Sequence, residues 1–393
     1  MKIGLCFSGC YRRGGVERVV LATANGLARR GHDVHVFARV FEPSELDPAV
    51  TPHPVPAPSK PPAWELLRFG ARCAAEVRRS GLTFDALGGF GVACPATDLG
   101  WVQSVHARWL ECSRGPAGGG AAQRLRRRLN PFHAAALRME RRRFGPGPGS
   151  HRRLLALSRE VADDLSRFYG VADARITRLP NGVDTDAFHP ARAAAGRDPA
   201  RRRFGLTPDD RVLVFVANES PRKGLPSLIE AVARRGDPRV KLLAAGRLPQ
   251  AEVRRHAARR GVEAQLRFTG PLDDVAEAYA AGDVFVLPTH YEAWGLVIVE
   301  ALACGLPVVT TRRAGAAEAI DDGRTGRLID DPGDVKTLAD AVGGCLAGLP
   351  STPAERHEAA RRYRWERIVQ RYETALREAA EPRRTPGVGV VVA

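Results

Sequence analysis

The chain has 393 residues, and 60 Lys or Arg against 44 Asp or Glu give it a formal net charge of +16. This length suits two domains rather than one. No run approaches the roughly eighteen apolar residues of a membrane span, and Met1 leads into a strand-like segment rather than a signal peptide, so we expect a cytoplasmic protein. The seven cysteines form no CxxC pair and show no zinc spacing, which predicts reduced thiols and no metal site.

The positive charge invites a nucleic-acid hypothesis, but only five of the 60 basic residues are lysines, and the arginines are scattered with alanine through most of the chain. Aromatic residues are too few for a base-stacking platform, so we expect no nucleic-acid partner. One real basic cluster lies within residues 124–143. Its arginines are Arg124, Arg126, Arg127, Arg128, Arg138, Arg141, Arg142 and Arg143.

Such a basic stretch, interleaved with apolar residues, can lie on anionic lipid or on an acidic acceptor. A solvated helix face explains it equally well. We expect Arg126, Arg127, Arg141 and Arg142 to face an acceptor or a membrane, and we treat peripheral association with the inner face of the cell membrane as a hypothesis. Glycine-rich loops at 115–120 and 145–149 bracket the cluster, which favours a mobile, acceptor-facing insertion.

The amino terminus is typical of a doubly wound parallel sheet, with a strand at 3–7, a glycine loop at 8–15, a helix at 16–30 and a strand at 33–38. The loop has neither GxGxxG nor the phosphate-loop pattern. Its paired glycines, Gly14 and Gly15, indicate that a ligand approaches the backbone closely, and a plain tight turn is the alternative.

The middle of the first half is expected to contain a proline-rich loop at 47–62, a helix at 64–80 and strands at 84–89 and 99–103. His106 follows the last of these strands at its carboxyl end, where open α/β sheets bind ligands. It is therefore a candidate site residue, and a locally satisfied histidine is the alternative. Segments 154–157, 158–169 and 175–179 complete a first domain.

A polar connector at 192–208 places the domain junction near residue 185, so we expect domains at 1–185 and 186–361. Apolar strands at 212–217, 240–245, 266–269, 284–287 and 307–310 alternate with helices, as in a parallel sheet buried on both faces. The fold class is α/β, with two Rossmann-like domains facing each other across a cleft. A helix at about 353–380 is expected to cross back to the first domain over 362–380, or else to lie on the second, and 382–393 is a loose tail.

Two carboxylates, Glu292 and Glu300, flank a turn and the start of an apolar helix after the strand at 284–287. The free amides of that helix start, at Gly295 and Leu296, favour an anion. Glu292 lies in the loop and could reach neutral hydroxyls beside the anion, while Glu300 lies within the helix. This pattern suits an anionic ligand flanked by polyhydroxylated groups.

Arg222 and Lys223 follow the first strand of the second half, again at a carboxyl end. A planar guanidinium beside a compact ammonium suits a diphosphate whose leaving charge must be stabilised. A basic loop on a basic protein is the alternative. Arg247, after the next strand, could line a base pocket.

These residues together resemble the retaining family-four glycosyltransferases of GT-B fold, over about residues 1–345. The resemblance rests on the order of GGVER (14–18), LPNGVD (179–184), SPRKG (220–224), FTG (268–270) and the pair Glu292 and Glu300 separated by seven residues. Within that family the chain is similar to bacterial lipopolysaccharide-core glucosyltransferases through VANESPRKG (216–224) and NPFHAAALRMERRRF (130–144).

The resemblance implies a role for each matching position. Arg222, Lys223 and the amides of Gly295 and Leu296 would hold the donor diphosphate, Glu292 the sugar hydroxyls and Glu300 the ribose. Gly15 would lie beside the diphosphate from the opposite domain, and His106 would face the sugar and the acceptor. Ala293 stands where the family usually has glycine, which puts the donor preference in doubt. The expected catalytic set is Arg222, Lys223, Glu292 and His106, and the expected donor-binding set is Gly15, Arg247, Ala293, Trp294, Gly295, Leu296 and Glu300.

We therefore expect a metal-independent, retaining transferase that moves a hexosyl unit from a nucleotide-diphosphate sugar such as UDP-glucose to a glycan or lipid-linked acceptor in cell-envelope polysaccharide synthesis. It needs no cofactor. A non-catalytic nucleotide-sugar-binding protein at a membrane surface is the alternative. A paired-carboxylate hydrolase is disfavoured, because basic groups suited to phosphate accompany the two glutamates. A nucleotide-dependent oxidoreductase is disfavoured by the missing fingerprint.

Overall fold

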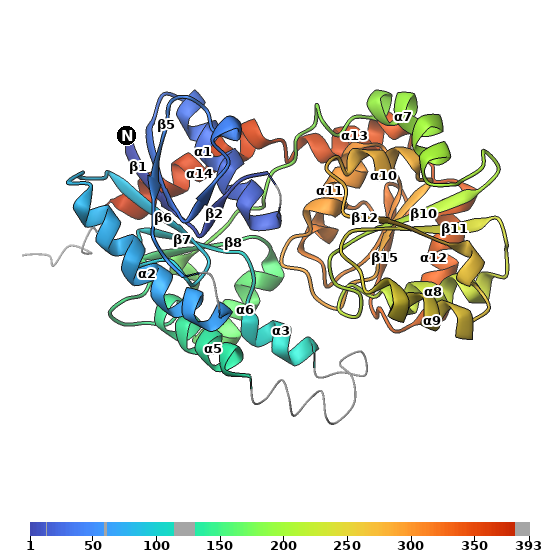
Figure 1. Ribbon diagram of the computed structural model, residues 1–393, viewed down its shortest axis with the longest axis horizontal. Helices are drawn as coiled ribbons and strands as arrows, with labels where there is room; N and C mark the ends of the chain where they lie inside the picture. The colour runs from blue at the N-terminus through green and yellow to red at the C-terminus, as the bar shows by residue number, and fades with distance from the viewer. Residues whose placement is uncertain (13, 59–60, 114–129, 382–393) are drawn as a thin grey trace, which may run out of the picture.

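A computed structural model describes residues 1–12, 14–58, 61–113 and 130–381. Two α/β halves lie side by side, each with helices around a parallel sheet (Figure 1). The predicted fold class, two facing Rossmann-like domains, is confirmed.

The first half is built on a seven-stranded sheet in which all strands are parallel. Its spatial order is β5 (Val50–Pro54), β3 (Asp33–Ala38), β1 (Lys2–Cys6), β6 (Ala86–Phe90), β7 (Leu99–Val102), β8 (Arg153–Ala156) and β9 (Ile176–Arg178). A separate parallel pair joins β2 (Gly9–Cys10) and β4 (Val40–Phe41). The helices are α1 (Gly15–Arg29), α2 (Pro62–Arg79), α3 (His106–Cys112), α5 (Pro131–Phe144) and α6 (Arg159–Tyr169), with 3-10 turns η1 (Pro43–Glu45) and η3 (Asp173–Arg175).

The second half is built on a six-stranded parallel sheet. Its order is β12 (Leu266–Gly270), β11 (Val240–Ala245), β10 (Arg211–Val216), β13 (Val284–Leu287), β14 (Val308–Thr311) and β15 (Gly326–Ile329). The helices of this half are α7 (Pro190–Arg203), α8 (Leu225–Arg235), α9 (Gln250–Arg259), α10 (Ala276–Ala281), α11 (Leu296–Ala303), α12 (Val335–Ala347) and α13 (Pro353–Arg361), with 3-10 turns η4 (Glu263–Gln265) and η5 (Gly315–Ala319). The last helix, α14 (Trp365–Ala380), lies against the first half (Figure 1).

The centre of the second sheet positions the predicted site. Strands β10 and β13 are neighbours, with Leu213 opposite Val284 and Val214 opposite Phe285. All four of these side chains are fully buried, as expected for strands covered on both faces. Because parallel neighbours end at the same edge of a sheet, the loops after β10 and β13 meet there.

Three sequence predictions about local structure are wrong, for the proline-rich loop, the polar connector and the basic insertion. The predicted proline-rich loop contains the strand β5, which tolerates Pro52 and Pro54 because it lies at the sheet edge. The predicted connector at 192–208 contains most of helix α7, which has almost no apolar face and buries only Ala200 and Arg201. Its Arg201 is held by hydrogen bonds to Ala281 O and Asp283.

The predicted mobile insertion is also wrong for its second part, because residues 131–144 form helix α5. That helix buries Ala136, Met139, Glu140, Arg143 and Phe144. The arginines at 124 and 126–128 lie outside the described residues.

The carboxyl-terminal helix is divided in two at residues 362–364, where Val183 N donates to Tyr363 O at 2.8 Å and Trp365 N donates to Val183 O. Helix α14 then packs on α1, β6 and β7 of the first sheet. Its Tyr372 hydroxyl donates to Pro180 O at 2.8 Å and its ring meets Trp101 edge to face. The junction near residue 185 stays a prediction, and the predicted tail at 382–393 lies outside the described residues.

Candidate active site

Three charged side chains meet at the carboxyl edge of the second sheet. Arg222 and Lys223 come from the loop after β10, and Glu292 comes from the loop after β13. Lys223 forms an ion pair with the Glu292 carboxylate, and Arg222 Nη1 lies 3.8 Å from Glu292 Oε2. These side chains are only 14–18% exposed. Arg222 Nε also donates to Glu219 Oε2 at 2.9 Å, but Glu219 is 39% exposed. Two cations and one carboxylate thus share the largely buried position at the edge where α/β sheets bind ligands.

The two loops are locked to each other by main-chain contacts. Arg222 O accepts hydrogen bonds from His290 N at 2.8 Å and from Thr289 Oγ1 at 3.2 Å. Gly224 has φ of 79°, and a Cβ there would lie 1.9 Å from Pro288 O, so only glycine permits this approach. The arginine and lysine are therefore held in register with the loop that carries Glu292.

Opposing effects act on the proton affinity of Lys223. Burial, followed by the adjacent Arg222 guanidinium, lowers the pKa of Lys223 well below its usual value. The contact with the Glu292 carboxylate favours the charged ammonium instead. An anionic ligand would favour the ammonium further, because it adds negative charge beside both cations.

Helix α11 begins beside these groups without a side-chain cap. Its N-cap, Gly295, is left-handed with φ of 99°, and the first turn carries no acidic side chain. Ile298 N already donates to Gly295 O at 3.0 Å, so the amides of Leu296 and Val297 are the donors that this helix start offers to an anion. The indole of Trp294 is buried against Tyr363, with ring centroids 5.3 Å apart, and Ala293 is buried too. The predicted donor contact of Trp294 is therefore restricted to its main chain.

Glu300 is more fully engaged than the sequence suggests. It is 3% exposed, accepts a hydrogen bond from Tyr279 Oη at 2.9 Å, and forms an ion pair with Arg18 of helix α1 in the other half. The predicted ribose contact of Glu300 stays a prediction, and it requires Arg18 to share or release this carboxylate. Arg18 is part of the GGVER segment, yet nothing in its spacing indicates Glu300 as its partner.

Gly15 begins helix α1 and is exposed. No atom lies within 4 Å of a Cβ built at this position, so the space in front of it is open. Arg18 follows one turn later and reaches Glu300, which brings the start of α1 to the second half. The predicted position of Gly15 beside the diphosphate remains a prediction.

His106 is the first residue of helix α3, not a free side chain at a strand end. Its ring stacks on Trp109 at 5.3 Å, and its Nε2 lies 3.0 Å from His133 Nδ1. Burial, followed by His133, lowers the pKa of His106 to about 4, so the imidazole is neutral at neutral pH. The preceding amide, Val105 N, donates to Tyr291 Oη at 2.9 Å. Because Tyr291 precedes Glu292 in the chain, His106 is tied to the loop that carries the carboxylate.

The remaining predicted residues lie further from this cluster. Arg247 is exposed, and its main-chain N donates to Asn218 Oδ1 at 3.0 Å. Arg141 and Arg142 are exposed on α5. Arg126 and Arg127 lie outside the described residues.

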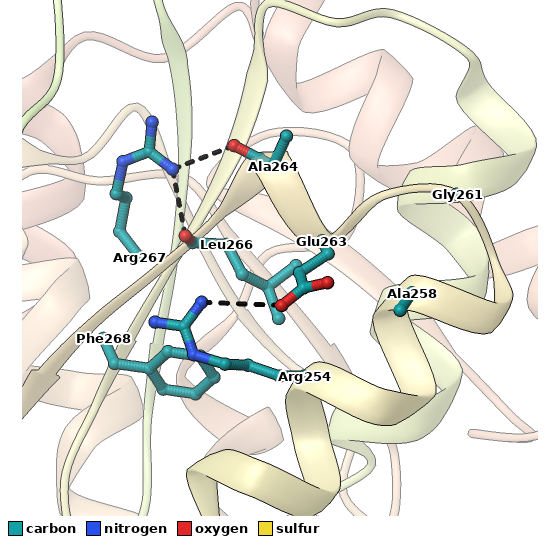
Figure 2. A pocket seen from close by; sticks show the side chains of 8 residues that line it. All are labelled: Arg254, Ala258, Gly261, Glu263, Ala264, Leu266, Arg267 and Phe268. Carbon is teal, nitrogen blue, oxygen red and sulfur yellow. Dashed lines mark hydrogen bonds and ion pairs between the residues drawn. The ribbon is translucent and has the colours of Figure 1, made fainter.

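A cavity of about 720 Å³ lies apart from these groups, between helix α9 and edge strand β12 (Figure 2). Its charged side chains already have partners. Arg254 lies 4.9 Å from the Phe268 ring centre and 4.0 Å from Glu263, and Arg267 Nη1 donates to Ala264 O and Leu266 O. The polar groups of this cavity are turned to one another, so the charged cluster is the better candidate site.

Among the residues that the structure describes, no group of three or more His, Cys, Asp or Glu side chains is arranged to hold a metal ion. Likewise, no helix in the described part of the chain is long and apolar enough to cross a membrane.

Comparison with known proteins agrees with this architecture. Residues 13–187 match the family model described as Glycosyltransferase Family 4, and residues 210–347 match the one described as Glycosyl transferases group 1. The D-inositol 3-phosphate glycosyltransferase of Acidothermus cellulolyticus is 31% identical over 417 residues, which cover 96% of this chain and 88% of that protein. D-inositol 3-phosphate glycosyltransferase 2 of Catenulispora acidiphila is 39% identical over 210 residues, 49% of this chain. That match spans about half, 48%, of the relative's own length.

A similar solved structure is that of WaaG, a glycosyltransferase involved in lipopolysaccharide biosynthesis. It superposes with a TM-score of 0.72 at 24% identity, over 96% of this chain and 98% of that chain. The two parallel sheets, the motifs at the edge between them and the family models lead to one conclusion: the chain belongs to glycosyltransferase family 4 and has the GT-B fold.

Proposed function

We propose that this protein transfers a hexosyl unit from a nucleotide-diphosphate sugar, such as UDP-glucose, to a glycan or lipid-linked acceptor in cell-envelope polysaccharide synthesis. Transfer proceeds with retention of configuration and without a metal ion. The observation that carries the proposal is the meeting of Arg222, Lys223 and Glu292 beside the uncapped start of α11.

The chemistry of glycosyl transfer matches this arrangement. Cleavage of the sugar–phosphate bond builds negative charge on the departing diphosphate. Two cations and a helix start oppose that charge in a poorly hydrated site without a divalent ion. When the diphosphate takes over the charge of Lys223, Glu292 becomes free to accept hydrogen bonds from the sugar hydroxyls.

We propose that retention proceeds without a covalent glycosyl-enzyme intermediate, on the basis of the contacts of the two carboxylates. Glu300 is paired with Arg18 and Tyr279, and Glu292, once the diphosphate takes over Lys223, accepts hydrogen bonds from the sugar hydroxyls, so neither carboxylate is assigned as the nucleophile of a covalent intermediate. Attack from the face of the leaving group, with the departing phosphate accepting the acceptor's proton, fits these contacts. Anomeric assignment of the product by NMR tests retention, and an unchanged rate in excess EDTA tests independence of metal.

The acceptor is defined less closely than the donor. The names of the relatives make D-inositol 3-phosphate a second acceptor to test, since one of them aligns with 96% of this chain. We therefore propose that acceptor assays include this phosphorylated polyol beside glycan and lipid-linked acceptors.

A surface formed by α2 and α5 supports docking on anionic lipid. The two helices pack on each other and lie on the same side of the molecule (Figure 1). Trp64 and Leu67 are 48% and 47% exposed. Both helices carry exposed arginines, namely Arg68, Arg72, Arg138, Arg141 and Arg142, and Arg68 lies over the Trp64 ring at 3.9 Å. Apolar side chains amid arginines are typical of a peripheral membrane surface.

Vesicle sedimentation tests this docking. We expect binding to vesicles that contain anionic lipid, and its loss in high salt or after Arg141→Glu with Arg142→Glu. Arg255→Glu with Arg259→Glu, on exposed positions of α9, is the matched charge reversal and should leave binding unchanged. Equal binding to neutral vesicles, or independence of salt, would contradict membrane docking by charge.

The catalytic proposal is tested by screening nucleotide sugars for hydrolysis and for acceptor-dependent nucleotide release. Lys223→Ala and Glu292→Gln should each lower kcat/KM by about a hundredfold or more, because both act where charge develops. Lys336→Ala, which breaks an exposed ion pair with Asp340, is the matched control. Full transfer by both site variants would overturn the assignment, and donor binding without any turnover would establish the non-catalytic alternative.

A further inference from the structure

The start of helix α3 is held by side chains from distant parts of the chain. Its N-cap residue, Val105, has no side-chain acceptor, and its first residue is His106. Val105 N instead donates to Tyr291 Oη at 2.9 Å. His106 N donates to Glu140 Oε1 at 2.5 Å, and Ala107 N donates to Glu140 Oε2 at 3.2 Å. Three consecutive amides are thus satisfied by one tyrosine of the second half and one glutamate of α5.

Glu140 is 1% exposed, and its hydrogen bonds come from neutral groups. Tyr169 of α6 donates its hydroxyl to Oε2 as well. Burial raises the pKa of Glu140 to about 7, against the hydrogen bonds, which lower it. A buried carboxylate held only by neutral donors costs stability relative to an apolar side chain. Its presence at this position therefore points to a role other than packing.

The same helix α5 also contacts the His106 ring. His133 Nδ1 lies 3.0 Å from His106 Nε2, and Phe132 meets the ring edge to face. Glu140, two turns later on α5, fixes the main chain of His106. The main chain and the imidazole of His106 are thus both held by helix α5. Tyr291, through Val105 N, connects the start of α3 to the loop that carries Glu292.

We propose that Glu140, supported by Tyr169, is a positioning residue that sets the His106 imidazole against the reacting groups. This inference rests on the proposed function, in which His106 faces the donor sugar and the acceptor. Glu140 touches neither substrate. It acts by fixing where α3 begins, because its two oxygens accept hydrogen bonds from the amides of His106 and Ala107.

Glu140→Gln tests this role, because glutamine keeps the shape but turns one acceptor into a donor facing Ala107 N. In assays above pH 7, where the Glu140 carboxyl is mostly ionised, we expect kcat to fall about tenfold, as loss of a charge-assisted hydrogen bond predicts. The donor KM should stay within about twofold, because Arg222 and Lys223 are untouched. Tyr169→Phe should lower kcat less, by about threefold, because it removes one of the hydrogen bonds to Oε2 and leaves both amide caps.

Asp164→Asn is the matched control. Asp164 is 5% exposed, and burial raises its pKa to about 7 as well, but it lies 3.8 Å from Arg108 and caps no amide of α3. Its kcat should change less than about twofold. An equal loss of kcat in Asp164→Asn would mean that any buried carboxylate of this region has the same effect, and would overturn the proposal.

A double-mutant cycle separates positioning from general damage to the fold. If Glu140 acts through His106, Glu140→Gln should have almost no further effect on kcat in the His106→Ala background. Additive losses would overturn the inference.

A second readout does not depend on turnover, because the NMR signals of the His106 ring should shift in Glu140→Gln and not in Asp164→Asn. If no donor is turned over but the ring signals shift, the proposed function is wrong and the positioning of His106 by Glu140 is still supported. If the ring signals do not shift in Glu140→Gln, the positioning role of Glu140 is wrong.

Discussion

The two sides of the candidate site are held in different ways. Arg222, Lys223 and Glu292 lie on loops after neighbouring parallel strands and contact one another directly. His106 lies on a seven-residue helix that lacks a cap of its own and depends on Glu140 and Tyr291. The side proposed to bind the diphosphate is thus organised by the sheet, whereas the side that carries His106 is organised by individual side chains from distant segments. Single substitutions should therefore act differently on the two sides.

The largest effect that sharpens this comparison is expected at His106. His106→Ala should lower kcat by about a hundredfold, the range seen when a positioned side chain at a reacting centre is removed, and leave the donor KM nearly unchanged. Steady-state kinetics measure both constants. His256→Ala, at a histidine of α9 that lies 3.7 Å from Glu230, should be neutral. A rise in donor KM with unchanged kcat would place His106 on the binding side instead.

The stability of the His106 side should depend on pH through Glu140. The pKa of Glu140 is raised from 4.5 to about 7, so the folded protein favours its protonated form. The contribution of Glu140 to the free energy of unfolding is therefore fully present below pH 4.5 and is lost as the pH rises through about 7. The groups that face it are Tyr169 of α6 and the amides of His106 and Ala107. Between pH 5.5 and 7.5 the free energy of unfolding of the wild type should fall by about 2 kcal/mol relative to that of Glu140→Gln, at 1.36 kcal/mol per pKa unit.

Urea unfolding of both proteins at several pH values measures that difference. A gap between the wild type and Glu140→Gln that stays constant across this range would show that Glu140 does not titrate there. It would then be held ionised by its three donors.

The diphosphate side should be sensitive to backbone strain at Gly295. Gly295→Ala places a Cβ 3.0 Å from Glu292 Cγ and Ile298 Cδ1 at φ of 99°, a strain of about 1–3 kcal/mol. We expect kcat/KM to fall about tenfold, because relief of that strain moves Glu292. Gly348→Ala has a similar φ of 112° with no atom within 4 Å of the Cβ, and should lose stability without losing activity. Equal activity loss in both variants would argue against a local effect on Glu292.

The smallest expected effect concerns the ion pair between the two sides. Arg18→Met frees Glu300 from a partner that occupies the predicted ribose acceptor. We expect the donor Kd to fall about threefold, since a contact worth ~0.5–1 kcal/mol no longer competes. Titration calorimetry with the donor nucleotide measures this change. Weaker binding would show instead that Arg18 is itself part of the donor site.

Much of the proposed diphosphate side could be predicted from the sequence. Residues 33–38, 240–245 and 284–287 were predicted as strands and are β3, β11 and β13 with those limits. Their continuous apolar runs are a local signal. The rule that parallel strands end at one edge then brings the loops of Lys223 and Glu292 together without knowledge of any side-chain contact.

Other elements left no such signal. Helix α7 escaped prediction because it has almost no apolar face, and β5 because its prolines are tolerated only at a sheet edge. Only the tertiary structure shows that Arg18 meets Glu300, that Val105 meets Tyr291 and that Glu140 caps α3. These pairs are 282, 186 and, at the closest, 33 positions apart in the chain. The sequence by itself determined the apolar central strands, the family and the loops at the sheet edge, since those follow from local periodicity and chain order. The tertiary structure alone decided which buried side chains hold His106 and Glu300, because such contacts depend on how distant segments pack and not on any pattern within them.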